Sequence, residues 1–198
     1  MPSAWSQTDW DNRNSRCCQN IIVNAHTIHG GISVEASYVP NLIDQNFIWG
    51  TQGHGIYEHD CSHQVFAHNF IGLSTGSGLH SHGRMTDRQI DGHPPEYGLH
   101  QVRNNLLYQN AKTNVFGGQP STISGNLSEG ISAGFDRATQ TLTLSATERP
   151  PGCGLVSEVS RDFFGKPRNG SDTVAGPFDP IPTEPSKLRL WGVRSNPW

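Results

Sequence analysis

The chain has 198 residues, a formal net charge of −3, 22 glycines and 33 % apolar residues. Its length is that of one domain. The charges are scattered, which gives no basic footprint for nucleic acid and no charged tail, and no apolar run reaches the ~18 residues of a membrane span. This composition favours a turn-rich β-solenoid, whose narrow core needs few large side chains.

The chain contains an internal repeat. Gly31, Gly55 and Gly78 each open a unit, and the steps between them are 24 and 23 residues (55 − 31 and 78 − 55). In each unit an apolar residue precedes an asparagine by three positions, and an apolar pair usually follows. The asparagines are Asn20, Asn46, Asn69, Asn105 and Asn126, and the apolar residues before them are Cys17, Ile43, Phe66, Val102 and Ile123. Short apolar runs broken by Gly, Asn and Ser predict three strands and three turns per unit.

The recurring asparagine predicts an inward turn in which each side-chain amide bonds the asparagines of the neighbouring turns. The alternative is a solvent-facing turn former. No window shows a helical apolar period, which argues against a helical solenoid, and the leucine ladder of a leucine-rich repeat is absent. We therefore expect an all-β, right-handed, single-stranded parallel β-helix of the pectate-lyase type, with about five turns.

Residues 1–30 are expected to complete a first turn, and residues 31–83 hold the clearest repeats. The step from Asn69 to Asn105 is 36 residues (105 − 69), longer than the steps before it. The excess makes 84–100 an inserted polar loop that leaves one corner of the helix.

Residues 101–132 give another turn and a half, and 139–146 alternate as a strand. From Pro150 onward the chain is rich in proline and is expected to cap the last turn. The domains predicted are solenoid turns over 1–135, terminal strands and a C-terminal cap over 136–170, and an extended tail over 171–198.

The first turn would leave an open parallel edge, where solenoids normally carry a cap. The start of the chain lacks the regions of a signal peptide. We therefore expect a longer protein of which this is the C-terminal part, or an oligomer that covers the edge. The cysteines show no metal spacing and leave the compartment undecided, with a secreted or periplasmic location open; they are Cys17, Cys18, Cys61 and Cys153.

Glu35 is the residue that the repeat singles out for chemistry. Cys17 and Ile43 take equivalent positions in successive turns, and eight residues before them are Asp9 and Glu35. Because neighbouring strands lie about 4.7–4.9 Å apart, two carboxylates in one outward column would lie about 5 Å apart. That matches the separation of about 5–5.5 Å in a retaining glycosidase. The pair predicts a nucleophile and an acid/base, and the alternative is two ordinary exposed acids.

Histidine and tyrosine side chains are frequent in the sequence that follows Glu35. Counting from the repeat glycines puts His59 and His82 in the column of Glu35, whereas counting back from Phe66 would put Glu58 there. Such side chains bond sugar hydroxyls or stack on sugar rings. The alternative is a set of polar side chains on a solvated face. The substrate-binding residues predicted are Trp10, Tyr57, Glu58, His59, His80 and His82.

Several motifs are familiar: Asp9-Trp10, Ser15-Arg16, QNIIVN at 19–24, ISVEAS at 32–37, LIDQNFI at 42–48 and the closing DFFGKPRNG at 162–170. Through them the chain resembles bacterial right-handed parallel β-helix proteins, and within these glycoside hydrolase family 120, the β-xylosidase-like enzymes. In that family an Asp-Trp pair carries the nucleophile and a Val-Glu on the next strand the acid/base. The resemblance assigns these roles to Asp9 and Glu35 and implies xylo-oligosaccharide substrates.

The chain departs from that family in two ways. The gap between the two acids is longer here, through HTIHGG at 26–31. The preceding turns and the inserted β-sandwich of the family have no counterpart in this sequence.

The leading hypothesis is a retaining glycoside hydrolase that acts on oligo- or polysaccharides without a cofactor or metal, in which Asp9 attacks and Glu35 is acid and base. One alternative is a polysaccharide lyase or epimerase, which would need Ca²⁺ and a base such as Arg84, Arg88 or His82. Another is a non-catalytic carbohydrate-binding β-helix. No nucleic-acid or membrane partner is expected.

Overall fold

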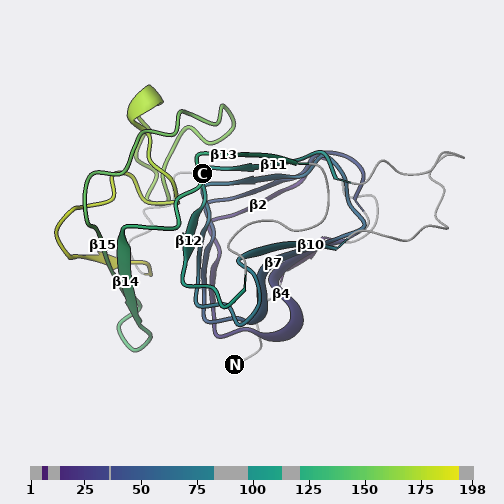
Figure 1. Cartoon of the computed structure of the whole chain (residues 1–198), viewed down its shortest axis with the longest axis horizontal. Helices are drawn as coiled ribbons and strands as arrows, with labels where there is room; N and C mark the ends of the chain where they lie inside the picture. Colours follow the sequence, from purple (N-terminus) through teal and green to yellow (C-terminus); the bar gives the residue numbers. More distant parts are fainter. Residues whose placement is uncertain (1–5, 9–13, 36, 83–97, 113–120, 192–198) are drawn as a thin grey trace, which may run out of the picture.

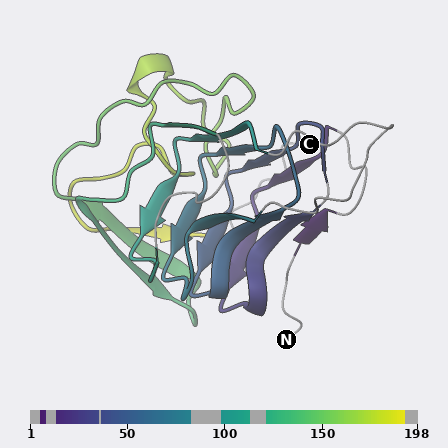
Figure 2. The same cartoon turned by 45° about the vertical axis from the view of Figure 1, so that its right-hand side comes forward.

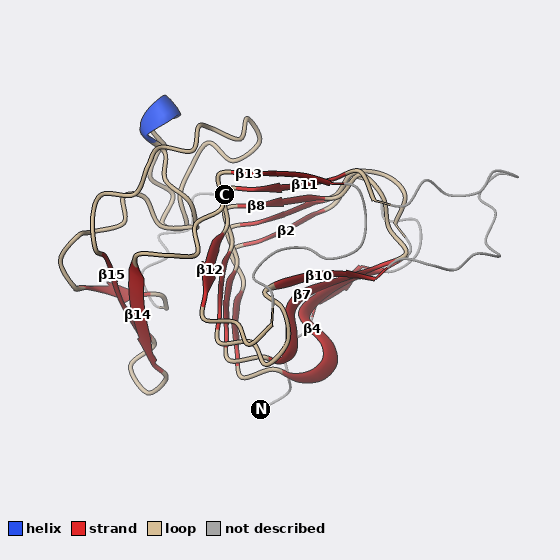
Figure 3. Ribbon diagram, viewed as in Figure 1, coloured by secondary structure: helices blue, strands red, loops and turns tan. Residues whose placement is uncertain are grey.

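The computed structural model describes residues 6–8, 14–35, 37–82, 98–112 and 121–191. Within them the chain is a right-handed parallel β-solenoid of about four turns, against the five that the sequence predicts. In Figure 1 the strands of successive turns lie almost behind one another. Among the described residues the one helical element is the short turn η1 (Gly170–Asp172), drawn in blue in Figure 3. No helix in the described ranges is long and apolar enough to cross a membrane.

Three parallel sheets, which we call A, B and C, form the walls of the solenoid. From β2 to β10 the chain runs through sheet B, then C, then A in each turn (Figure 2). Sheet A contains β1 (Ser6–Thr8), β4 (His26–Glu35), β7 (Gln52–His59) and β10 (Leu79–His82). Sheet B contains β2 (Arg16–Cys18), β5 (Leu42–Asp44), β8 (Val65–Ala67), β11 (His100–Arg103) and β13 (Ser121–Ser124). Sheet C contains β3 (Ile21–Val23), β6 (Phe47–Trp49), β9 (Phe70–Gly72) and β12 (Leu106–Tyr108).

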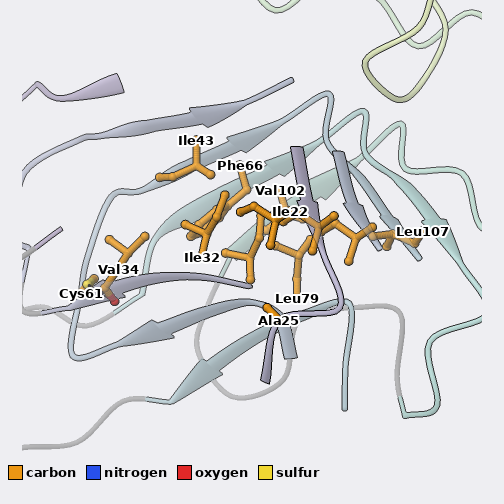
Figure 4. Close-up of a cluster of buried hydrophobic side chains, with 13 residues drawn as sticks. Ile22, Ala25, Ile32, Val34, Ile43, Cys61, Phe66, Leu79, Val102 and Leu107 are labelled. Carbon is orange, nitrogen blue, oxygen red and sulfur yellow. Dashed lines mark hydrogen bonds between the residues drawn. The ribbon is translucent and has the colours of Figure 1, made fainter. Parts of the chain in front are cut away.

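The register predicted from the repeat is confirmed in sheet B. Cys17 pairs with Ile43, Ile43 with Phe66, Phe66 with Val102, and Val102 with Ile123. Side chains of this column meet inward residues of sheets A and C and fill the interior of the solenoid (Figure 4). The buried members of this inner core are Ile22, Ala25, Ile32, Val34, Ile43, Ile48, Ile56, Cys61, Phe66, Ile71, Leu79, Val102 and Leu107.

The asparagines form the interior ladder that the sequence predicts. Nδ2 of Asn46 donates to Oδ1 of Asn69 at 2.9 Å, and Nδ2 of Asn69 donates to Oδ1 of Asn105 at 2.9 Å. The same bond joins Asn20 to Asn46 and Asn105 to Asn126. From Asn46 to Asn126, each Nδ2 also donates to a backbone carbonyl of the preceding turn. The three central asparagines are completely buried, so the solvent-facing alternative is wrong.

The glycines that open the repeats lie where successive turns approach closely. A Cβ on Gly55 would lie 2.1 Å from Cγ2 of Ile71 and 2.6 Å from the carbonyl oxygen of Gly78. No side chain fits there. The repeat requires glycine at this position because successive turns pack closely at the corner between sheets C and A.

The chain after the solenoid packs along the outside of sheet C (Figure 1). Its strands β14 (Ile131–Asp136), β15 (Thr141–Ala146) and β16 (Ser186–Arg189) form an antiparallel sheet. β15 is the strand predicted over 139–146. A second apolar cluster joins this segment to the outward side chains Phe47, Phe70 and Leu106. In each apolar pair of the repeat, the first residue thus faces the C-terminal segment and the second faces the interior.

The segment 171–198, expected as an extended tail, is described as far as residue 191. In this part Val174, Phe178, Ile181 and Leu190 are buried, and β16 pairs with β15. The residues are held against sheet C rather than extended away from it.

Four side chains at the corner between sheets B and C bond the C-terminal segment. Each belongs to the residue before a ladder asparagine, and each of these residues has a left-handed backbone, φ 53–58°. All four bond backbone carbonyl oxygens: Gln19 Nε2 with Phe163 at 3.2 Å, Gln45 Nε2 with Arg161 at 2.7 Å, His68 Nδ1 with Gly176 at 3.2 Å and Asn104 Nδ2 with Gly154 at 2.8 Å. We call these four residues the corner column.

Candidate functional site

The outer face of sheet A carries most of the side chains that the sequence picks out. Glu35 pairs with His59, and His59 pairs with His82, which is the column obtained by counting from the glycines. In the next outward column Tyr57 pairs with His80. Because side chains alternate along a strand, these residues share one face, while the residues between them turn into the core.

The rings on this face stack across β7 and β10. The ring centroids of His54 and His80 are 4.1 Å apart with planes at 9°, and those of His59 and His82 are 5.3 Å apart. Tyr57 lies between the two pairs, 5.7 Å from His80 and 6.0 Å from His59. We call these five rings the ring face. They offer one continuous surface of flat side chains with polar edges.

β4 brings Glu35 to the edge of the ring face. The register of β4 against β7 shifts between His26 and Gly30, within the HTIHGG stretch. A Cβ on Gly30 would lie 2.8 Å from both Cβ and N of Tyr57, so glycine allows the tyrosine to approach the strand. His29 meets the Tyr57 ring at 5.1 Å, and its Nδ1 lies 3.6 Å from Oε1 of Glu35. The carboxylate stays accessible, with 27 % of the side chain exposed.

The pKa values of three groups make much of this face neutral. Burial, then the neighbouring His80, Lys112 and His29, lower the pKa of His54 to about 4. Burial, then His82, lowers the pKa of His80. Burial, then Glu35, raises the pKa of Tyr57. At neutral pH the two imidazoles are therefore uncharged and the phenol keeps its proton. Such a surface suits a neutral ligand that carries hydroxyl groups.

Glu58 does not lie on the ring face, although the sequence predicts it among the substrate-binding residues. It pairs with Val34 and Ser81 and turns into the solenoid, where it is 1 % exposed. Its Oε1 accepts the Cys61 backbone N–H at 2.6 Å, and its Oε2 accepts the Ser81 hydroxyl. The count back from Phe66, which set Glu58 in the column of Glu35, is wrong by one residue.

His100 completes this buried polar cluster. Its Nδ1 accepts the backbone N–H of Gln64 at 3.1 Å, so the ring proton lies on Nε2, which faces Oε2 of Glu58 at 3.4 Å. The group is sealed inside the solenoid and has a structural role.

The remaining predicted residues lie outside the described ranges. These are Asp9 and Trp10, together with Arg84 and Arg88 of the lyase alternative. The nearest described neighbour of Asp9 is Thr8, which pairs with Val34, the residue before Glu35. Among the residues that the structure describes, no three or more His, Cys, Asp and Glu side chains are arranged to hold a metal ion.

Two residues of the site were missing from the sequence prediction, His29 and His54. The even number of residues from His29 to Glu35 was a signal that both share one face, but the register shift between His26 and Gly30 interrupts the alternation there. His54 had no such signal, because its contact with His80 depends on how the turns stack.

The chain is therefore a parallel β-solenoid in which sheet A carries the ring face, with the Glu35 carboxylate at its edge. No known protein family, curated protein or solved structure matches this chain.

Proposed function

We propose that the protein is a retaining glycoside hydrolase that works on the outer face of sheet A. Asp9 is the nucleophile and Glu35 the acid/base, and the ring face binds the sugar. The observation that carries the proposal is the pairing of Thr8 with Val34 in parallel strands. The repeat of the sequence predicts that the next residue, Asp9, takes the position beside Glu35, about 5 Å away by the spacing of strands, and a retaining mechanism needs that separation.

The chemistry follows from that separation. Asp9 attacks the anomeric carbon and forms a glycosyl-enzyme, while Glu35 gives its proton to the leaving oxygen. Glu35 then removes a proton from the water that releases the sugar. His29, at 3.6 Å from Oε1, orients the Glu35 carboxylate. Tyr57, His59, His80 and His82 stack on sugar rings through their flat faces and bond hydroxyl groups through their polar edges.

The test measures the hydrolysis of aryl β-xylosides by the chain and its variants. Asp9→Asn should abolish turnover. Glu35→Gln should lower kcat about 10²–10⁴-fold, the usual contribution of a general acid/base, and should lose less with a dinitrophenyl leaving group, which needs no proton. The matched control is Glu148→Gln, an exposed acid of the C-terminal segment, which should keep wild-type kcat. Full activity of Asp9→Asn would refute the proposal.

A second function, carbohydrate binding without turnover, is favoured by the ring face itself, because stacking needs no acid. In that case the chain binds xylo-oligosaccharides in calorimetry and hydrolyses none of them. Tyr57→Ala should then weaken binding, and Asp9→Asn should leave it unchanged.

A further inference from the structure

A backbone hydrogen bond holds His54 in its neutral form. Its Nδ1 accepts the backbone N–H of Ser77 at 3.0 Å, and only an imidazole with a free lone pair on that nitrogen can accept. The ring proton of His54 therefore lies on Nε2. A Cβ on Gly76 would lie 2.8 Å from the same Nδ1, so the turn before β10 closes tightly over this nitrogen. A second proton on the ring would break the bond to Ser77.

His54 and His80 depend on each other's charge state. Their ring centroids are 4.1 Å apart and their planes differ by 9°. Both side chains are half-buried, so water and salt screen charges between them less than at an open surface. Two neutral rings can make this contact, whereas two imidazolium ions would repel each other out of it. We call this pair the His54–His80 stack.

Groups from several elements set how readily the His54–His80 stack takes up a proton. Burial, then His80, Lys112 and His29, lower the pKa of His54 to about 4. Burial and then His82 lower the pKa of His80, and the opposing effect of Glu58 is smaller. His54 therefore stays neutral well below the usual histidine pKa of about 6.5. The charged and titratable groups that face the stack or the neighbouring Tyr57 are His29 and Glu35 on β4, Glu58, His59 and Asp60 on and after β7, His82 on β10, and Lys112.

Loss of the His54–His80 stack would remove one end of the flat surface. The ring of Tyr57 lies 5.8 Å from that of His54 and 5.7 Å from that of His80. Separation of the two imidazoles would therefore also take away contacts that hold the tyrosine in place. A sugar that stacks on these rings needs them side by side, so its binding requires the neutral form of the stack.

We propose that acid releases the sugar from the ring face, because a proton on the His54–His80 stack breaks the bond to Ser77 and drives the two rings apart. Such release depends on the sugar-binding role of the ring face in the proposed function. It adds a regulatory property to that surface. The site is occupied at neutral pH and empties in acid, and it binds again once the proton is lost.

The test measures the binding of xylotriose by calorimetry at pH 7 and pH 4, with Asp9→Asn in every protein so that the ligand is not cleaved. Affinity should be roughly tenfold lower at pH 4, which corresponds to a pKa of the stack that is one unit lower with sugar bound than without. The double variant His54→Gln, His80→Phe has no titratable ring in the stack, and the Gln amide oxygen can still accept from Ser77. It should bind equally well at both pH values. The matched control His63→Asn, which changes an exposed histidine outside the ring face, should lose affinity in acid like the parent protein.

A measurement without ligand tests the same step. In a nuclear magnetic resonance titration the Ser77 amide signal should shift as His54 takes up its proton, and it should not respond in the double variant. Circular dichroism verifies that each protein keeps its β-signal at pH 4. If the double variant fails to fold, His54→Gln alone should still reduce the loss of affinity in acid.

Two results would overturn acid release and leave the proposed function standing: equal affinity of the parent protein at pH 7 and pH 4, or a double variant that loses affinity in acid as the parent does. A protein that binds no xylotriose at pH 7 would instead refute the sugar-binding role of the ring face, and acid release with it.

Discussion

His68 shows how one residue in the corner column makes stability depend on pH. Its Nδ1 bonds the carbonyl of Gly176, and its Nε2 accepts from Nδ2 of Asn104, both at 3.2 Å, so the ring must be neutral. Burial, then the positive charge of Arg168, lowers its pKa to about 3. Gln19 and Gln45 make the corresponding bond in the preceding turns without a titratable group.

The native state should therefore lose stability as the pH falls below the histidine pKa of the unfolded chain, about 6.5. Between that value and about 3 the unfolded state binds the extra proton and the folded state does not, so acid favours unfolding. Urea unfolding should show a loss of about 2 kcal/mol from this group between pH 7 and pH 5.

The control for this prediction is His68→Gln, which copies the neighbouring turns. Its unfolding free energy should fall less steeply over the same pH range. Identical slopes for the two proteins would mean that His68 titrates alike in the folded and unfolded states.

The asparagine ladder is the element that joins the turns. The side chain of Asn69 makes four bonds: it donates to the Ile43 carbonyl and to Asn105 Oδ1, and it accepts the backbone N–H and Nδ2 of Asn46. All these partners are shielded from water. Replacing a ladder asparagine in the middle of the solenoid should therefore lower the free energy of unfolding much more than replacing one at its end.

Asn69→Ala should lower the free energy of unfolding by roughly 3 kcal/mol, because several buried groups lose their partners. Asn20→Ala at the exposed end should cost about 1 kcal/mol, since water can replace its bonds. Denaturant titration of both variants measures the difference. Equal losses would show that burial of the ladder contributes little.

The columns of residues that fill the solenoid interior could be predicted from the sequence. An asparagine that recurs at one position among apolar residues predicts a buried ladder of side-chain amides. Prediction of the ring face depended on the register assumed between successive turns, because an error of one residue moves a side chain to the other face of a strand. That is why Glu58 was placed wrongly while His59 and His82 were placed correctly. The catalytic pair Asp9 and Glu35 stays a prediction.

The contact of the C-terminal segment with sheet C was harder to foresee, because that segment has no repeat to count. One signal was present. Phe47-Ile48 and Phe70-Ile71 are consecutive apolar residues on short strands, and a strand that is apolar on both faces is buried on both faces. Sheet C therefore needed a cover, although the sequence did not say which residues supply it.

At the scale of the whole molecule, the packing of the C-terminal segment against sheet C contributes much of the stability of the protein. Phe178 is 2 % exposed, and its ring packs against Phe47, Phe70 and Phe163 at centroid distances of 6.4, 6.3 and 5.6 Å. The outward side of the solenoid wall and the C-terminal segment thus share one core.

Phe178→Ala should destabilise the protein by about 3–5 kcal/mol through the cavity that it leaves. The matched control is Phe164→Ala: this ring also contacts Phe178 but is 37 % exposed, and its loss should cost about 1 kcal/mol, the centre of the range for single substitutions. Thermal and urea unfolding compare the two. A Phe178→Ala variant as stable as the Phe164→Ala variant would mean that the segment rests on the sheet without stabilising it.

The bond from Gln19 to the Phe163 carbonyl has a consequence for biosynthesis. The two residues are 144 positions apart, and a ribosome adds about 5–20 residues each second. The turn that contains Gln19 therefore waits on the order of ten seconds for Phe163 to be translated. During that interval the phenylalanines of sheet C lack the segment that covers them, so the nascent chain is prone to aggregate until its C-terminal segment emerges.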